Sequence, residues 1–322
     1  MRLSKVLDLF LDDCRTRKLA DATLSSYEGN LRHLIALATV LSEDNLSGFT
    51  EELVAAYFAA NVKKGNVVAT LITKRAAVVE FARFCQRKRY LLLDPTVNMP
   101  RYRLPYRLPR PYTSGECARL LALTTTEKEV ERRVAGKRVR AWTTIPMPSV
   151  EVMIRGLLYL AGLRVGTVCR LRIGDIEAGQ GDTLGKITVI TKGDRQIQVP
   201  IVPELARLLS DYMIEHTDLR PKSFLLSRRH GLPWTVRMVQ RAVTGWGRAA
   251  GVPNATSHRF RHTAGKEFLE TGATLEETQG FLGHANIATT QVYRRVTNQA
   301  VADAALRRAQ TVRPESTPNA TP

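Results

Sequence analysis

The sequence predicts a mainly α-helical protein of two domains with one small antiparallel β-sheet. Its 322 residues exceed the usual size of a single domain, so each of two domains can bury its own core. Apolar residues recur at helical spacing through most of the chain, and only two short neighbouring runs are rich in β-branched residues. These observations favour a helical N-terminal domain and a second domain that contains the sheet.

The N-terminal domain is expected to cover residues 1–93. Asp21 can cap a helix whose apolar stripe consists of Leu24, Tyr27, Leu31, Leu34, Ile35 and Ala38. A second stripe consists of Val68, Leu71, Ile72, Val78, Val79, Ala82 and Cys85. Both stripes are expected to form core. The basic residues around the second stripe, including Lys74 and Arg75, are therefore expected on polar faces that are available to an anionic partner.

Residues 94–111 are predicted to form a linker. They include five prolines and show no helical period, and proline fixes φ and removes a backbone donor. The segment also contains Arg101, Arg103, Arg107 and Arg110, interleaved with two tyrosines. This composition suits a solvated linker and equally a segment that crosses a phosphate backbone.

The second domain is expected to span residues 112–311. A helix should begin at Ser114. A second, apolar helix is expected over Val150 to Leu163, with Gly162 as the signal for its end. The runs Lys186 to Ile190 and Gln196 to Ile201, separated by TKGDR, predict a β-hairpin.

The rest of the chain to about Gln310 is expected to be helical, and residues 312–322 have the composition of a disordered tail. The mixed-charge segment from Glu127 to Ser149 receives no structural prediction and no predicted role.

The charge of the chain points to a polyanionic partner. Lys and Arg number 48 against 30 Asp and Glu, a net charge of +18, and nucleic acid is the commonest polyanion, with an anionic membrane as the rival. No apolar stretch approaches the ~20 residues that span a membrane, and the opening MRLSKVLDLFLDD is too acidic for a secretory signal. A soluble, cytoplasmic protein is expected. The four cysteines form no CxxC pair and are expected to be buried thiols.

Six residues form a candidate catalytic set. They are Arg164 in AGLRVGT, Lys192 in TKGDRQ, His258 and Arg261 in SHRFRH, His284 in LGH, and Tyr293 in TTQVYRR. Each alone has a structural explanation: an arginine favoured by a helix dipole, a solvated turn lysine, a packing tyrosine. Together they suit chemistry on a phosphodiester.

Displacement at phosphorus places negative charge on the non-bridging oxygens, which guanidinium groups such as Arg164 and Arg261 are shaped to hold. Tyr293 can attack phosphorus, but its phenol has a pKa near ~10 and needs neighbouring cations and a proton acceptor. His258 lies three residues from Arg261 on a predicted helix, hence on the same face, and is the favoured acceptor.

These segments resemble the motifs of the tyrosine recombinase, or phage-type integrase, family. AGLRVGT resembles its first arginine box, HRFRHTAG its His-x-x-Arg box and LGHANIATTQVY its final box, while Lys192 falls in the position of the hairpin lysine. The N-terminal helices resemble the core-binding domain of the family. The resemblance thus extends over nearly the whole chain and implies a helical DNA-binding domain followed by a catalytic domain.

The resemblance implies a site-specific recombinase for integration, excision or resolution of DNA elements. Tyr293 would form a 3′-phosphotyrosyl link, with the other five residues of the set in the active site and without metal, ATP or another cofactor. The implied partner is double-stranded DNA with inverted half-sites, bound by a homotetramer on paired sites and by a monomer when free. The protein would associate with the nucleoid when bound to DNA.

The chain departs from the family pattern at two places. Thr167 stands three residues past the box arginine, where the family often has an acid, and the segment from Glu127 to Ser149 is longer than the usual connection. The motifs are common to recombinases that act in phage integration, transposon movement, cassette exchange and chromosome dimer resolution. They therefore define neither the biological role nor the DNA site.

Several other functions remain as alternatives. A tyrosine-type topoisomerase would use the same chemistry, and a catalytically silent DNA-binding regulator would use the same fold. A zinc site at His258 and His262 lacks the glutamate of zinc peptidases and has Arg259 and Arg261 beside it. The stretch GQGDTLGKI around Lys186 only imitates a phosphate-binding loop, because the required glycine spacing and the Ser or Thr after the lysine are missing.

Overall fold

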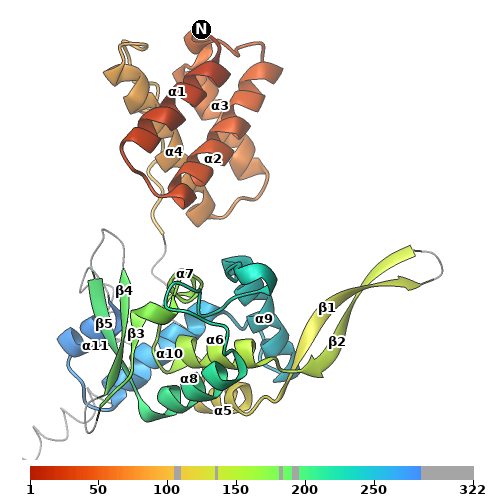
Figure 1. Ribbon diagram of the computed structural model, residues 1–322. Helices are drawn as coiled ribbons and strands as arrows, with labels where there is room; N and C mark the ends of the chain where they lie inside the picture. Colours follow the sequence, from red (N-terminus) through yellow and green to blue (C-terminus); the bar gives the residue numbers. More distant parts are fainter. Residues whose placement is uncertain (105–109, 135–136, 181–183, 191–195, 284–322) are drawn as a thin grey trace, which may run out of the picture. The chain divides into compact units, whose positions relative to one another are not determined.

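The computed structural model describes residues 1–104, 110–134, 137–180, 184–190 and 196–283 (Figure 1). The chain separates into two compact units, Met1–Arg107 and Leu108–Pro322. Unit 1 is helical, and unit 2 is mainly helical with two small antiparallel sheets. The predicted fold class is therefore confirmed.

Unit 1 contains four α-helices and one short 3₁₀ helix within residues 1–104. They are α1 Leu3–Thr16, α2 Asp21–Val40, η1 Leu46–Gly48, α3 Glu51–Lys63 and α4 Val68–Arg87. The two predicted apolar stripes lie on α2 and α4, and Leu31, Leu34, Val78 and Ala82 are fully buried. Burial of these stripes against α1 holds the unit together.

Three details of unit 1 differ from the sequence predictions. Asp21 does not cap α2: Ala20 occupies that position, and Asp21 is the first helical residue, where its charge suits the helix dipole. The predicted linker begins inside the unit, because Met99 is buried in the core and Tyr102 packs against Phe58 at 6.0 Å between ring centroids.

Lys74 does not lie on a polar face. Lys74 is only 7% exposed. Its Nζ donates to the Tyr57 hydroxyl at 3.3 Å and lies 5.4 Å from the centroid of the Tyr57 ring. Burial lowers the pKa of Lys74, and Lys64 adds a smaller repulsion. The prediction placed it outside because the period of an apolar stripe does not reveal which flanking lysine stem lies along the core.

Unit 2 has seven α-helices in the part of the chain that the structure describes. They are α5 Ser114–Leu121, α6 Ser149–Tyr159, α7 Val165–Val168, α8 Pro203–Glu215, α9 Val236–Ala249, α10 Ser257–Glu270 and α11 Leu275–Leu282, with 3₁₀ turns η2 Ile173–Asp175 and η3 Arg229–Gly231. The helix expected over 150–163 thus ends earlier, at Tyr159, and Gly162 lies in the following turn with φ +57°.

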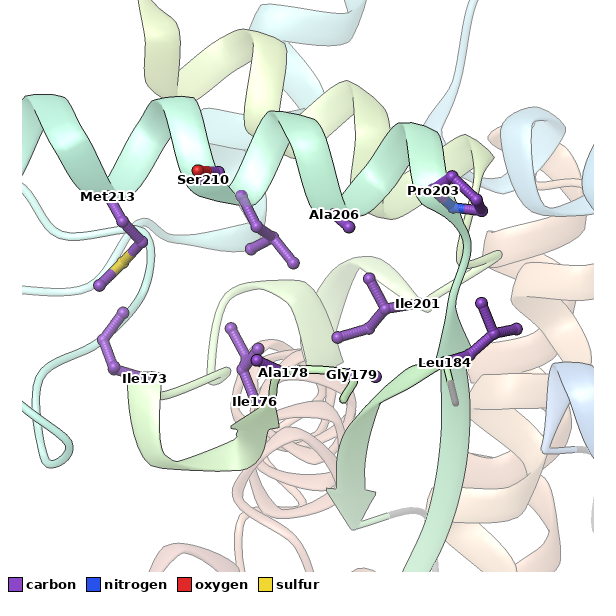
Figure 2. Close-up of a pocket in the computed structure, with 12 residues that line it drawn as sticks. Ile173, Ile176, Ala178, Gly179, Leu184, Ile201, Pro203, Ala206, Ser210 and Met213 are labelled. Atoms are coloured by element: carbon purple, nitrogen blue, oxygen red, sulfur yellow. The ribbon is translucent and has the colours of Figure 1, made fainter. Parts of the chain in front are cut away.

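The predicted hairpin is confirmed as β4 Gly185–Ile190 and β5 Gln196–Ile201, with Ile190 opposite Gln196. A two-residue strand, β3 Ile176–Glu177, pairs with β4 and was not predicted, since two residues show no period. Ile187 and Val199 face the core of the unit. Between this sheet and α8 lies an apolar cavity of about 560 Å³ (Figure 2), lined by residues such as Ile176 and Ala206.

The second sheet is a long hairpin in the segment that received no structural prediction. Strands β1 Thr125–Val134 and β2 Lys137–Pro146 pair along their whole length, and Figure 1 shows them reaching away from the helices. The base of the hairpin packs on α9 so closely that a Cβ at Gly245 would lie 2.0 Å from the Glu127 carbonyl oxygen. Arg248 also donates to the Glu127 carboxylate at 2.9 Å.

All four cysteines are free and buried, as predicted. Within the described ranges, no helix is long and apolar enough to cross a membrane.

We predict that Gly245→Ala destabilises unit 2 by about 1–3 kcal/mol, because the added methyl group forces β1 away from α9. The three tryptophans, Trp142, Trp234 and Trp246, all lie in unit 2, so urea unfolding followed by tryptophan fluorescence measures this unit.

Gly280→Ala is the matched control, since nothing lies within 4 Å of its added Cβ. Alanine is favoured over glycine inside a helix such as α11, so the control should unfold at the same or a higher urea concentration. Equal stability of the Gly245 variant and the wild type would contradict the described packing of the hairpin.

Candidate active site

Helix α10 carries both His258 and Arg261, one helical turn apart. The hydroxyl of Thr256 caps the helix by accepting from the Arg259 amide at 3.2 Å. Phe260 is fully buried between Tyr112 and Trp246, with ring centroids at 4.9 and 6.0 Å. This packing fixes the rotation of α10 and turns Arg261 into the protein.

Arg261 joins three segments that are distant in sequence. The residue is 3% exposed, and its guanidinium donates to the carbonyl oxygen of Gly162 at 2.6 Å and to that of Leu282. The turn can approach this closely because residue 162 is glycine: a Cβ there would lie 3.2 Å from both Leu282 and Phe281. A buried charge is stabilised when it is hydrogen-bonded. The two carbonyl oxygens stabilise the Arg261 guanidinium in this way.

Arg164 meets the same end of α11. It is exposed at the N-terminus of α7, and its Nη1 donates to the Gly283 carbonyl oxygen at 3.2 Å. Gly283 ends α11 in the left-handed conformation, with φ 59°. The two predicted arginines therefore converge on Leu282 and Gly283, directly before His284 in the chain.

His258 lies beside these cations with His262 one turn further along α10. The two rings meet edge to face, with centroids 4.3 Å apart. Part of the His258 ring is removed from water, and this burial lowers its pKa, with further lowering by Arg261 and Arg164. Burial, His258 and Arg261 lower the pKa of His262 to about 4. Both imidazoles are therefore neutral near pH 7.

Arg259 has a role that the sequence analysis missed. Its guanidinium donates to the Glu116 carboxylate at 2.8 Å and to the Arg110 carbonyl oxygen at 3.0 Å, and it lies 4.1 Å from the centroid of the Tyr112 ring. The Thr113–Glu116 capping box at the start of α5 was the available signal, because it fixes this carboxylate in place. Arg259 thus fastens the first residues of unit 2 to α10.

Other predicted residues are distributed as follows. Lys192, His284, Tyr293 and Arg107 lie outside the described residues, as does the predicted C-terminal helix. Arg101, Arg103 and Arg110 are exposed, and Arg75 is half-buried. Thr167 lies half-buried in α7, and Lys186 lies in β4 with its Nζ 3.1 Å from the Glu177 carboxylate. Lys186 thus lies in a strand and is paired with a carboxylate, so it does not belong to a phosphate-binding loop.

No group of three or more His, Cys, Asp or Glu side chains that could hold a metal ion occurs within the described ranges. The arginines and neutral histidines instead form a cationic site suited to an anion such as a phosphate group.

Comparison with known proteins identifies the class. The model of the Phage integrase family matches residues 131–300, just over half of the chain, and the chain belongs to this family. The match includes α10, α11 and the positions of all six predicted catalytic residues.

Individual relatives cover most of the chain. Tyrosine recombinase XerC of Corynebacterium efficiens is 27% identical over 94% of this chain and 91% of its own length. Tyrosine recombinase XerC of Methylobacterium sp. is 29% identical over 88% and 85%, respectively.

Two solved structures share the fold at a TM-score of 0.66. The lambda integrase dimer bound to a COC′ core site is 16% identical and covers 91% of this chain and 77% of that chain. XerH bound to a palindromic difH substrate, in a post-cleavage complex, is 17% identical over 90% and 80%.

We predict that the stability of unit 2 falls as the pH decreases from about 6.5 towards about 4. The folded state holds His262 neutral whereas the unfolded chain protonates it with an ordinary pKa, so the unfolded state binds more protons in this window. Between pH 7 and pH 5 the contribution is on the order of 1–2 kcal/mol.

Urea unfolding of the wild type and of His262→Asn at both pH values checks this expectation. The variant should show a smaller difference between the two pH values, whatever its absolute stability. An equal pH dependence in both proteins would mean that His262 is not held neutral by the fold.

Proposed function

We propose that this protein is a tyrosine site-specific recombinase that cleaves and rejoins DNA strands for the integration, excision or resolution of DNA elements. The observation that supports it best is the convergence of Arg164 and Arg261 on the end of α11 beside His258. Membership of the Phage integrase family agrees with this chemistry.

The two arginines hold the scissile phosphate. A guanidinium has five N–H donors, so a bond to a backbone carbonyl that orients the side chain is compatible with further bonds to phosphate oxygens. Arg261 is held from two sides by Gly162 and Leu282, and Arg164 by Gly283. Donors that are fixed before the reaction need no reorganisation as negative charge develops on phosphorus oxygens.

Tyr293 is the proposed nucleophile. Its phenolic oxygen bonds to phosphorus, the bond to the 5′-oxygen breaks, and a 3′-phosphotyrosyl link forms. The phenolic proton passes to His258, which is neutral near pH 7 because its pKa is lowered. The link keeps the energy of the broken phosphodiester, so attack by a 5′-hydroxyl rejoins the strand without ATP or metal.

Lys192 is the proposed general acid, and His284 completes the set. A DNA 5′-oxygen is a poor leaving group unless a proton reaches it as the bond breaks. Lys192 lies in the sequence between β4 and β5, where the chain turns from one strand to the next. His284 follows Gly283 in the sequence, and the Gly283 carbonyl oxygen accepts a hydrogen bond from Arg164.

Duplex DNA is the proposed substrate and partner, consistent with a net charge of +18. Inverted half-sites and a homotetramer on paired sites are the proposed assembly. In support, lambda integrase, which shares the fold, has been solved as a tetramer bound to a Holliday junction. The exposed Arg101, Arg103 and Arg110, together with Arg75 and Arg107, are proposed phosphate contacts, and the protein would act in the cytoplasm at the nucleoid.

Tyr293→Phe should retain DNA binding but form no covalent adduct, since only the phenolic oxygen is lost. The assay uses a nicked substrate built from the DNA that flanks the gene, followed by denaturing electrophoresis. Chelator serves as a control and should leave the wild-type adduct yield unchanged. Persistent adduct in the variant would place the nucleophile at another residue.

Lys192→Ala should cleave normal DNA poorly but regain nearly wild-type cleavage when sulfur replaces the bridging 5′-oxygen. A thiolate leaves without needing a proton, so this substrate bypasses the general acid. Cleavage rates of both proteins on both substrates are compared. An equal defect on the two substrates would make Lys192 a binding residue and would move the acid to His258 or His284.

A further inference from the structure

The β1–β2 hairpin is fastened to unit 2 only at its base in the contacts described. Thr126 is 1% exposed, and Arg248 binds the Glu127 carboxylate while its guanidinium lies 4.7 Å from the centroid of the Trp142 ring. Gly245 allows the β1 backbone to lie directly on α9. The base is thus packed closely on α9, whose inner face is buried.

In the outer half of the hairpin, the side chains that the structure describes, Glu131 and residues 138–140, are exposed. With about 3.4 Å per residue, its ten-residue strands extend roughly 30 Å. The Arg138 and Arg140 side chains are each 72% exposed, and Val139 between them is 43% exposed on the opposite face. An isolated two-stranded ribbon is at best marginally stable in water, so a partner that covers this part of the hairpin would stabilise it.

The charge of the outer half identifies the kind of partner. Residues 131–140 contain one acid, Glu131, against the five cations Arg132, Arg133, Lys137, Arg138 and Arg140. The ion pairs that Arg138 and Arg140 make with Glu131 and Glu129 are long, at 3.7 and 4.0 Å, and exposed, so they offer little resistance to exchange for another anion.

We infer that the outer half of the β1–β2 hairpin is an arm that binds duplex DNA. The width of the DNA major groove admits a two-stranded β-ribbon, and cations along such a ribbon lie within reach of the phosphates on either side. The arm extends the DNA contact of each protomer beyond the catalytic site and binds through phosphates, independently of sequence. This inference rests on the proposed function, which supplies the DNA.

The first test is the salt dependence of binding to a fluorescein-labelled duplex of arbitrary sequence. Each phosphate contact contributes about 0.9 to the slope of log affinity against log salt, so Arg138→Gln/Arg140→Gln should bind more weakly, with a slope lower by about 2. Arg15→Gln/Arg207→Gln is the matched control, because it removes the same charge from exposed, ion-paired arginines on α1 and α8. The control should keep the wild-type slope.

A cross-linking test uses Val139→Cys. The four natural cysteines are buried, so a photoactivated thiol reagent should modify residue 139 selectively. Irradiation with the duplex should join the arm to DNA. Cross-links to a second protein copy without DNA cross-links would overturn the inference and make the hairpin a contact between protomers.

Wild-type affinity and slope in Arg138→Gln/Arg140→Gln would equally overturn the arm, provided that its tryptophan unfolding curve matches that of the wild type. Failure of the wild type to bind the duplex would instead refute the proposed function. The hairpin holds none of the six proposed catalytic residues. Loss of the arm alone should therefore leave adduct formation by Tyr293 intact at low salt, where the remaining contacts retain DNA.

Discussion

The candidate site depends on the hydrogen bonds of the buried Arg261 guanidinium. This guanidinium binds the Gly162 and Leu282 carbonyl oxygens and so joins α10, the turn after α6 and the end of α11. A buried charge is costly unless its donors are bonded, and the two carbonyls are buried groups that need donors in turn. Each of the three segments is thus fixed by the other two. Arg164 adds a second bond to the same end of α11 from the exposed side.

The two sheets of unit 2 show opposite relations to the core. In β4 and β5, alternate residues such as Ile187 and Val199 are buried, so hydrophobic burial fixes the register of the strands. In β1 and β2, backbone pairing extends far beyond the last contact with α9, and charged residues occupy both faces. The first sheet is part of the core, whereas the second is a projection whose shape is set by its own hydrogen bonds and by one closely packed glycine.

This contrast explains how much the sequence could predict. Helices α2 and α4 follow from apolar periodicity, because burial on one side imposes that period, and the β4–β5 hairpin follows from two short runs rich in β-branched residues. The β1–β2 hairpin lacks a buried face along most of its length, so its residues show no alternation to detect. Lys74 was misplaced for a related reason, since periodicity reports apolar residues and not the path of a long basic side chain. In the site, the motifs predicted that Arg164, His258 and Arg261 lie together, but the carbonyls that hold the arginines depend on how the turn at Gly162 approaches α11.

The contacts of Arg259 have a mechanical consequence. Arg110, Tyr112 and Glu116 are all in contact with this one side chain, which neighbours His258 on α10. The segment from Arg110 to Glu116 is therefore fixed directly to the helix that bears His258. A force applied at Arg110 is transmitted through Arg259 to α10, so a displacement of the start of unit 2 would also displace His258.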